Sequence, residues 1–168
     1  MSQYSHIPQA SLLVRDARGR YHPATADQIL AAARQAIDEK MQRGADFGSP
    51  ADVKAYLRAK LAGLDHEVFT VLFLDNRHRL IEYVEMFRGT IDGASVHPRE
   101  VVKEALRLNA AAVILAHPHP SGNSEPSQAD KAITSRLREA LALIEVRTLD
   151  HIVVGGESTE SFAERGLL

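Results

Sequence analysis

The order of hydrophobic and polar positions divides the chain into short apolar runs and longer periodic segments. The continuous apolar runs at 68–74 and 111–116 are typical of buried strands. Segments in which apolar residues recur three and four positions apart predict helices that bury one face. Helices are predicted at 25–43, 50–61, 98–109, 131–143 and 161–168, and further strands at 10–15, 80–87, 144–147 and 151–154.

Two helix-start signals indicate where the chain divides. Thr25 and Gln28 have the spacing of a capping box ahead of an amphipathic helix, and Pro50 stands at the first position of the next helix. The linker between these helices is the expected boundary. We therefore expect an N-terminal extension with an amphipathic helix at 1–48 and a second domain at 49–168.

Composition narrows the class of protein. The chain has 168 residues, 45% of them hydrophobic, and 20 basic against 22 acidic residues give a net charge of −2. A dedicated nucleic-acid binder usually carries a basic excess, so direct nucleic-acid binding is not expected. No run approaches the ~20 apolar residues of a membrane helix and no signal peptide begins the chain, so no membrane contact is expected. The absence of cysteine fits a reducing compartment, and we expect a cytoplasmic protein.

The residues of strongest chemical character lie in a loop rich in Pro, Gly and Ser, between a predicted strand and a predicted helix. His117 and His119 are two positions apart, so along an extended backbone both imidazoles leave on the same side, and Asp130 can add a carboxylate oxygen. Two nitrogens and one oxygen leave one tetrahedral position open, as expected of a catalytic zinc ion. Structural explanations stay open, because the histidines can form a polar strand end and Ser127 with Asp130 also has the spacing of a helix cap.

The same loop carries a family signature. His117, His119, Ser127 and Asp130 match, without a gap, the pattern His-x-His, seven residues, Ser, two residues, Asp of the JAMM (MPN-type) metalloproteases. More narrowly, the chain is similar over roughly residues 50 to 168 to the RadC-like branch of that superfamily. Its hallmark segments are Phe87-Arg88-Gly89-Thr90, Pro98-Arg99-Glu100-Val101, Asn109-Ala110, His119-Pro120-Ser121-Gly122-Asn123, Pro126-Ser127-Gln128-Ala129-Asp130 and Leu149-Asp150-His151-Ile152. Pro118 replaces the asparagine usual in this branch, at a position that points away from the expected metal.

The resemblance implies a fold and an activity. The fold is α/β, a mixed central β-sheet flanked by helices as in JAB/MPN and cytidine-deaminase-like domains, here with an N-terminal helical appendage. Full-length bacterial members carry a helix-hairpin-helix region, of which the sequence shows no motif, so we expect a short form. The implied activity is zinc-dependent hydrolysis of an amide, peptide or isopeptide bond, with the zinc ion held by His117, His119 and Asp130.

Further residues complete the implied chemistry. Glu67 heads the apolar run 68–74, where the superfamily has the glutamate that handles the proton of the attacking water, and Glu85 is the alternative. Ser127 is expected to stabilise the developing oxyanion. His151 stands beside Asp150, but neighbours in a strand point to opposite faces, so the two are not expected to pair as a catalytic dyad. His151 is instead predicted to be a structural residue or to orient a metal ligand.

Two other functions stay open at this point. The family is historically named for DNA repair, so one is an accessory protein in a DNA transaction. The other is a non-catalytic interaction module with a bound metal. The expected partner is a peptide or amide-bond substrate, and a homo-oligomer also stays open.

Overall fold

A computed structural model describes residues 12–40, 42–47, 49–61, 63–64, 66–89, 95–156 and 158–168. The chain separates into two compact units, Met1–Ala36 and Ile37–Leu168. The domain boundary expected between residues 48 and 49 stays a prediction. No helix of the described residues is long and apolar enough to cross a membrane.

The first unit contains a hairpin and the start of a helix. Strands β1 (Leu13–Arg15) and β2 (Tyr21–Pro23) pair antiparallel. Helix α1 (Ala26–Lys40) follows. The predicted capping box is present, because the Thr25 backbone N–H donates to Gln28 Oε1 at 2.9 Å and the Gln28 N–H donates to Thr25 Oγ1 at 3.2 Å. Of the strand predicted at 10–15, the first two residues lie outside the described residues.

A five-stranded sheet forms the centre of the second unit. Its spatial order is β4-β3-β5-β6-β7, and only β5 and β6 pair in parallel among these neighbours. The strands are β3 (Val68–Leu74), β4 (Leu80–Arg88), β5 (Ala112–Pro118), β6 (Arg147–Val154) and β7 (Thr159–Ser161). The expected mixed central sheet is therefore confirmed.

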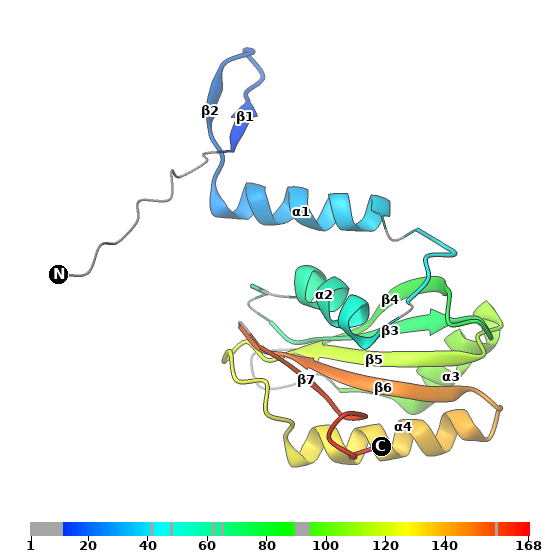
Figure 1. Ribbon diagram of the computed structural model, residues 1–168. Coiled ribbons are helices and arrows are strands. Elements are labelled where there is room, and N and C mark those ends of the chain that lie inside the picture. Colours follow the sequence, from blue (N-terminus) through cyan, green and yellow to red (C-terminus); the bar gives the residue numbers. More distant parts are fainter. Residues whose placement is uncertain are drawn as a thin grey trace. The chain divides into compact units, whose positions relative to one another are not determined.

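Helices cover both faces of this sheet (Figure 1). Helix α2 (Pro50–Leu61) packs on one face, and α3 (Pro98–Leu108) and α4 (Gln128–Ala142) pack on the other. Because side chains alternate along a strand, the even-numbered apolar residues of β3 and β5 pack with α2 and the odd-numbered ones pack with α3 and α4. The expected α/β fold with flanking helices is confirmed.

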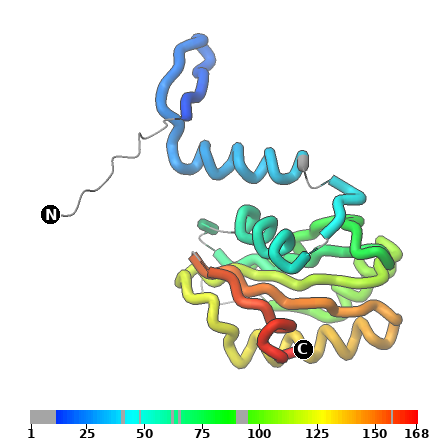
Figure 2. The backbone as a smooth tube through the Cα atoms, in the orientation of Figure 1, coloured from blue at the N-terminus to red at the C-terminus, as the bar shows by residue number. Residues whose placement is uncertain are grey.

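The crossover from β5 to β6 positions the candidate site. Figure 2 shows the chain leaving β5, running through α4 and returning as β6 beside it. Val113 and Leu115 point toward the α3–α4 face, so His117, two positions further on, leaves the sheet on that same face. The next residues form the loop that leads into the first turn of α4.

Two predicted elements differ from the structure. The strands predicted at 144–147 and 151–154 are one strand, β6, which begins at Arg147 after a turn in which Glu145 has a φ of 59°. The helix predicted at 161–168 is wrong. Ser161 instead ends β7 opposite Ile152, and a series of turns follows. Because Ser161 pairs with Ile152 of the neighbouring strand β6, the spacing of apolar residues within 161–168 could not reveal this pairing.

Candidate metal centre

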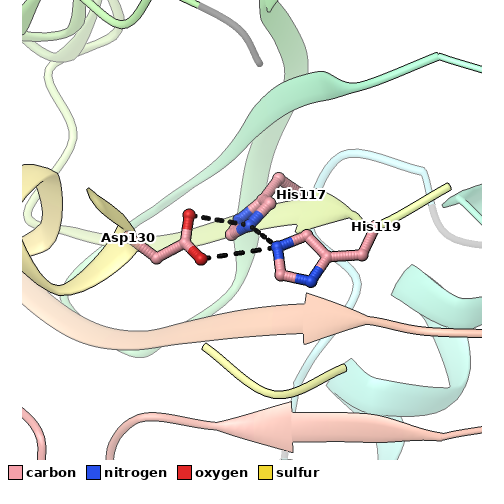
Figure 3. Close-up of side chains that lie close together, drawn as sticks. All are labelled: His117, His119 and Asp130. Atoms are coloured by element: carbon pink, nitrogen blue, oxygen red, sulfur yellow. Dashed lines mark hydrogen bonds and ion pairs between the residues drawn. The ribbon is translucent and has the colours of Figure 1, made fainter. Parts of the chain in front are cut away.

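Three side chains, from β5, from α4 and from the loop between them, converge at the end of β5 (Figure 3). His117 is in β5, His119 follows in the loop, and Asp130 lies in the first turn of α4. The two Nε2 atoms are 3.0 Å apart, and the Asp130 oxygens lie 3.1 Å from Nε2 of His117 and 3.4 Å from Nε2 of His119. One donor atom from each residue lies within 4.8 Å of the other two.

The start of α4 fixes the carboxylate of Asp130. Ser127 is the N-cap, and its hydroxyl oxygen accepts a hydrogen bond from the Asp130 N–H at 3.1 Å. The Ser127 N–H donates to Asp130 Oδ2 at 2.7 Å, which completes a capping box. The structural role considered for Ser127 and Asp130 is therefore present together with the convergence on the histidines.

The far nitrogen of each histidine ring also has a partner. Nδ1 of His119 lies 2.7 Å from the backbone carbonyl oxygen of Asn123, which can only accept, so this nitrogen carries the proton. Nδ1 of His117 lies 2.8 Å from Nε2 of His151. Partners on the outer nitrogens orient the rings so that both Nε2 atoms face Asp130.

Charge at the site favours a cation. Burial alone would raise the pKa of Asp130, but the hydrogen bonds with His117 and His119 outweigh it and hold that pKa well below its usual range. The hydrogen bond with Asp130 raises the pKa of His119, against the opposing effect of desolvation. An ionised carboxylate therefore attracts positive charge to the point where the two rings meet.

An open cleft of about 580 Å³ contains this cluster. Glu67, Ser127 and Arg136 line it together with the three converging residues. The charge of Glu67 contributes to the raised pKa of His119, which places this carboxylate within electrostatic reach of the cluster. Glu85 is not among the described lining residues. It lies on β4 with its carboxylate half-exposed, 3.6 Å from the Arg88 guanidinium.

The donor set suits a divalent first-row metal ion. Two imidazole nitrogens and a carboxylate oxygen are ligands that zinc accepts, and three protein ligands leave a position for water or substrate. Each outer ring nitrogen has a hydrogen-bond partner, as is usual for histidines that bind metals. Of the described His, Cys, Asp and Glu residues, only these three form such a cluster.

Other polar side chains of this unit lie elsewhere or have a different role. His78, in the turn before β4, lies 3.3 Å from an Arg147 nitrogen, and the ring of His97 makes an edge contact with Phe87. The Asp150 carboxylate does not pair with the His151 ring. It accepts from the His151 backbone N–H at 2.7 Å and from Ser161 Oγ at 2.6 Å.

The sequence interpretation missed two groups around the cluster. One is the Asn123 carbonyl oxygen, a backbone atom for which residue type gives no signal. The other is Thr134, whose hydroxyl lies 2.6 Å from Nδ1 of His151. Thr134 is four residues after Asp130 on a helix, so the spacing could have placed it one turn above the proposed ligand.

The fold and the site together define a class: an α/β domain with a His-His-Asp cluster at the carboxyl end of a central strand, inside an open cleft. Comparison with known families agrees with this class. The family model of the RadC-like JAB domain matches residues 47–167, and the chain belongs to this family.

Curated relatives support the assignment. The UPF0758 protein of Vibrio cholerae is 59% identical over 141 residues, which are 84% of this chain and 89% of that protein. The UPF0758 protein of Nitrosococcus oceani is 59% identical over all 168 residues, or 71% of its own length. A UPF0758 protein of Thioalkalivibrio sulfidiphilus is 59% identical over 145 residues, 86% of this chain but only 65% of the relative. The chain thus spans just under two thirds of the length of some of these relatives.

Proposed function

We propose that this chain is a zinc-dependent hydrolase of an amide, peptide or isopeptide bond. The observation that carries the proposal is the convergence of His117, His119 and Asp130 in a cleft that is also lined by a carboxylate, Glu67, and a hydroxyl, Ser127. A bound zinc ion would supply Lewis acidity, activating water and polarising a carbonyl oxygen.

The side chains divide the remaining work. Glu67 accepts the proton of the attacking water and delivers it to the leaving nitrogen, a role that requires an ionised carboxylate open to the cleft. Ser127 uses its hydroxyl oxygen to accept from the Asp130 N–H, so the hydroxyl hydrogen remains available to donate to a developing oxyanion. His117, His119 and Asp130 hold the ion.

Metal content is the first test. Protein purified without chelator should contain stoichiometric zinc, and His119→Ala should lose most of it because one of three ligands is gone. Wild-type protein that retains neither zinc nor another divalent metal after incubation with the ion would contradict the proposal.

The proton-transfer role can be tested with a matched pair of carboxylates. On a panel of peptides, isopeptide-linked peptides and amino-acid amides, Glu67→Gln should lower kcat about 100- to 10,000-fold and keep its zinc. Glu85→Gln is the control and should retain wild-type turnover. Equal effects of the two substitutions, or full activity of Glu67→Gln on a substrate that the wild type cleaves, would refute this assignment.

The oxyanion role predicts a smaller loss. Ser127→Ala should lower kcat about 100- to 1000-fold with little change in zinc content. The same substitution removes the N-cap acceptor and should cost about 1 kcal/mol of the free energy of unfolding. Ser127→Gly, which costs a helix start only a few tenths of a kcal/mol, should show the same loss of kcat and thereby separates the two effects.

We further propose that the partner is a peptide or amide-bond substrate rather than duplex DNA. The net charge of −2 supports this choice, because binding to the phosphate backbone rests on an excess of Lys and Arg. Fluorescence anisotropy with a labelled duplex at low salt should show no binding. Affinity that weakens steeply as salt rises would favour the DNA-transaction alternative.

A further inference from the structure

We propose that Thr134 and His151 are positioning residues that hold His117 in the tautomer required of a metal ligand. They do so through a directed chain of hydrogen bonds that begins at the backbone carbonyl of Asp130. The inference rests on the proposed function, because it concerns how that metal site is prepared. Neither residue is among the described residues that line the cleft.

The first hydrogen bond, from Thr134 to the Asp130 carbonyl, sets the direction of this hydrogen-bond chain. Thr134 Oγ1 lies 2.5 Å from the backbone carbonyl oxygen of Asp130, four residues earlier in α4. A carbonyl oxygen can only accept, so the single hydroxyl proton of Thr134 is committed to it. Toward any other partner, this hydroxyl can act only as an acceptor.

The second bond fixes the proton of His151. Nδ1 of this ring lies 2.6 Å from Thr134 Oγ1, and because that oxygen accepts, Nδ1 must carry a hydrogen. The ring is fully buried, stacked on Phe162 at 4.7 Å and in edge contact with Phe69 at 5.5 Å. When the ring carries a single proton, that proton is on Nδ1 and Nε2 is bare. Nε2 of His151 is therefore an acceptor.

The third bond transmits this constraint to the metal ligand. Nδ1 of His117 lies 2.8 Å from Nε2 of His151, so His117 donates its Nδ1–H to it. That leaves Nε2 of His117, 3.1 Å from Asp130 Oδ1, as the nitrogen that faces the proposed ion site. His119 reaches the same state by a shorter route, because its Nδ1–H donates to the Asn123 carbonyl.

The direction of this hydrogen-bond chain matters because the opposite tautomer of His117 would place a proton where the ion binds. If Thr134 did not accept, His151 could move its proton to Nε2 and donate to His117 Nδ1. The proton of His117 would then sit on Nε2, at the position where the ion binds. Loss of such an orienting partner typically costs about 10- to 100-fold in metal affinity.

The test compares variants of Thr134 in the full chain. Thr134→Val removes the hydroxyl at nearly constant volume and should weaken zinc binding about 10- to 100-fold in competition with a chromophoric chelator. Thr134→Ser restores the hydroxyl and should recover most of the affinity. Ser161→Ala is the control. It removes a buried hydrogen bond to Asp150 that is not part of the hydrogen-bond chain from Thr134 to His117, so its zinc affinity should match the wild type.

A measurement on the wild type needs no variant to fold. In metal-free protein at alkaline pH, two-bond proton–nitrogen correlation spectra should show His117 and His151 protonated at Nδ1 and bare at Nε2. Protonation of either ring at Nε2, or equal zinc affinity of Thr134→Val and wild type, would overturn the inference. Failure of the wild type to bind zinc while both rings are protonated at Nδ1 would instead count against the proposed function.

Discussion

At the scale of single residues, Asp130 takes part in two structures at once. Its Oδ2 accepts the Ser127 N–H at 2.7 Å in the helix cap, while Oδ1 lies 3.1 Å from Nε2 of His117. The cap holds the carboxylate in place as α4 forms, so the ligand is oriented before an ion arrives. Ordering a flexible side chain costs conformational entropy. Because folding of α4 already orders Asp130, metal binding does not have to supply that free energy.

Protons and zinc compete for the same atoms, which predicts a pH dependence of metal binding. The pKa of His119 is raised by its hydrogen bond with Asp130, so in metal-free protein this ring stays protonated to a higher pH than an ordinary histidine. Zinc must displace that proton. Its affinity should therefore fall as pH drops through the raised pKa, by about tenfold per pH unit for one displaced proton. Asp130 stays ionised across this range because its pKa is lowered.

Chelator competition at a series of pH values measures this dependence. His78→Ala serves as a control, because His78 lies in a turn outside the cleft, and it should leave the curve unchanged. An affinity that is constant across the titration range of His119 would contradict the prediction.

The sequence indicated the three side chains that converge but not all of the groups that orient them. The spacing of His117, His119 and Asp130 within one short loop was sufficient to predict their convergence. The bond between His151 and His117 joins residues 34 positions apart and depends on the register of β5 with β6. Such a register follows from tertiary pairing, so the sequence could suggest a supporting role for His151 but no partner.

At the scale of elements, the turn between β6 and β7 holds the loop that carries His119. The Gly156 N–H donates to the Gly122 carbonyl at 3.1 Å, and the hydroxyls of Ser124 and Ser158 are 2.7 Å apart. The His119 N–H donates to the carbonyl of Val154 at 2.8 Å. The loop is therefore anchored to the sheet on both sides of Asn123, whose carbonyl orients His119.

This close approach predicts a steric requirement at Gly155. A Cβ atom there would lie 2.6 Å from the Gly122 carbonyl oxygen and 2.8 Å from the Ser124 nitrogen, both backbone atoms. Gly155→Ala should therefore displace the loop, lower the free energy of unfolding by about 1 to 3 kcal/mol and weaken zinc binding. Chemical denaturation and chelator competition measure the two effects.

The adjacent glycine is a matched control. A Cβ atom on Gly156 would come no closer than 3.8 Å, to Gly122 Cα, so Gly156→Ala should change stability by less than about 0.5 kcal/mol. Equal behaviour of the two variants would show that the contact at Gly155 does not hold the loop.

The C-terminal element shows why some of the fold could not be predicted. The Asp150 carboxylate accepts from Ser161 Oγ and from the Ala163 N–H at 2.9 Å, which ties the segment after β7 to β6. A local pattern had indicated a helix at 161–168. Ser161 and Ala163 are 11 and 13 residues away from Asp150, and their hydrogen bonds with its carboxylate outweigh the local preference of this segment for a helix. In contrast, β3 and α4 followed the predicted pattern because their apolar spacing coincides with the faces that they bury.

At the scale of the whole molecule, the core belongs to the second unit. Both hydrophobic clusters, one under α2 and one under α3 and α4, draw their residues from Ile37 onward. The three proposed ligands and the described residues that line their cleft also lie in this unit.

This division predicts that a chain beginning at Ile37 keeps the fold and the metal site. Its two apolar clusters are complete, so it should unfold in one cooperative transition and bind zinc as tightly as the full chain. The cut falls within α1, so a second truncation beginning at Thr25, which retains the whole helix and its cap, is the matched comparison. Differential scanning calorimetry and chelator competition provide the measurements, with His119→Ala in the shorter chain to show that the zinc signal comes from this site. The contrary result is a chain from Ile37 that is insoluble or binds zinc more weakly, beside a chain from Thr25 that is soluble and binds zinc as tightly as the full chain. Residues 25–36 would then contribute to the fold of the second unit, and the second unit would not fold independently.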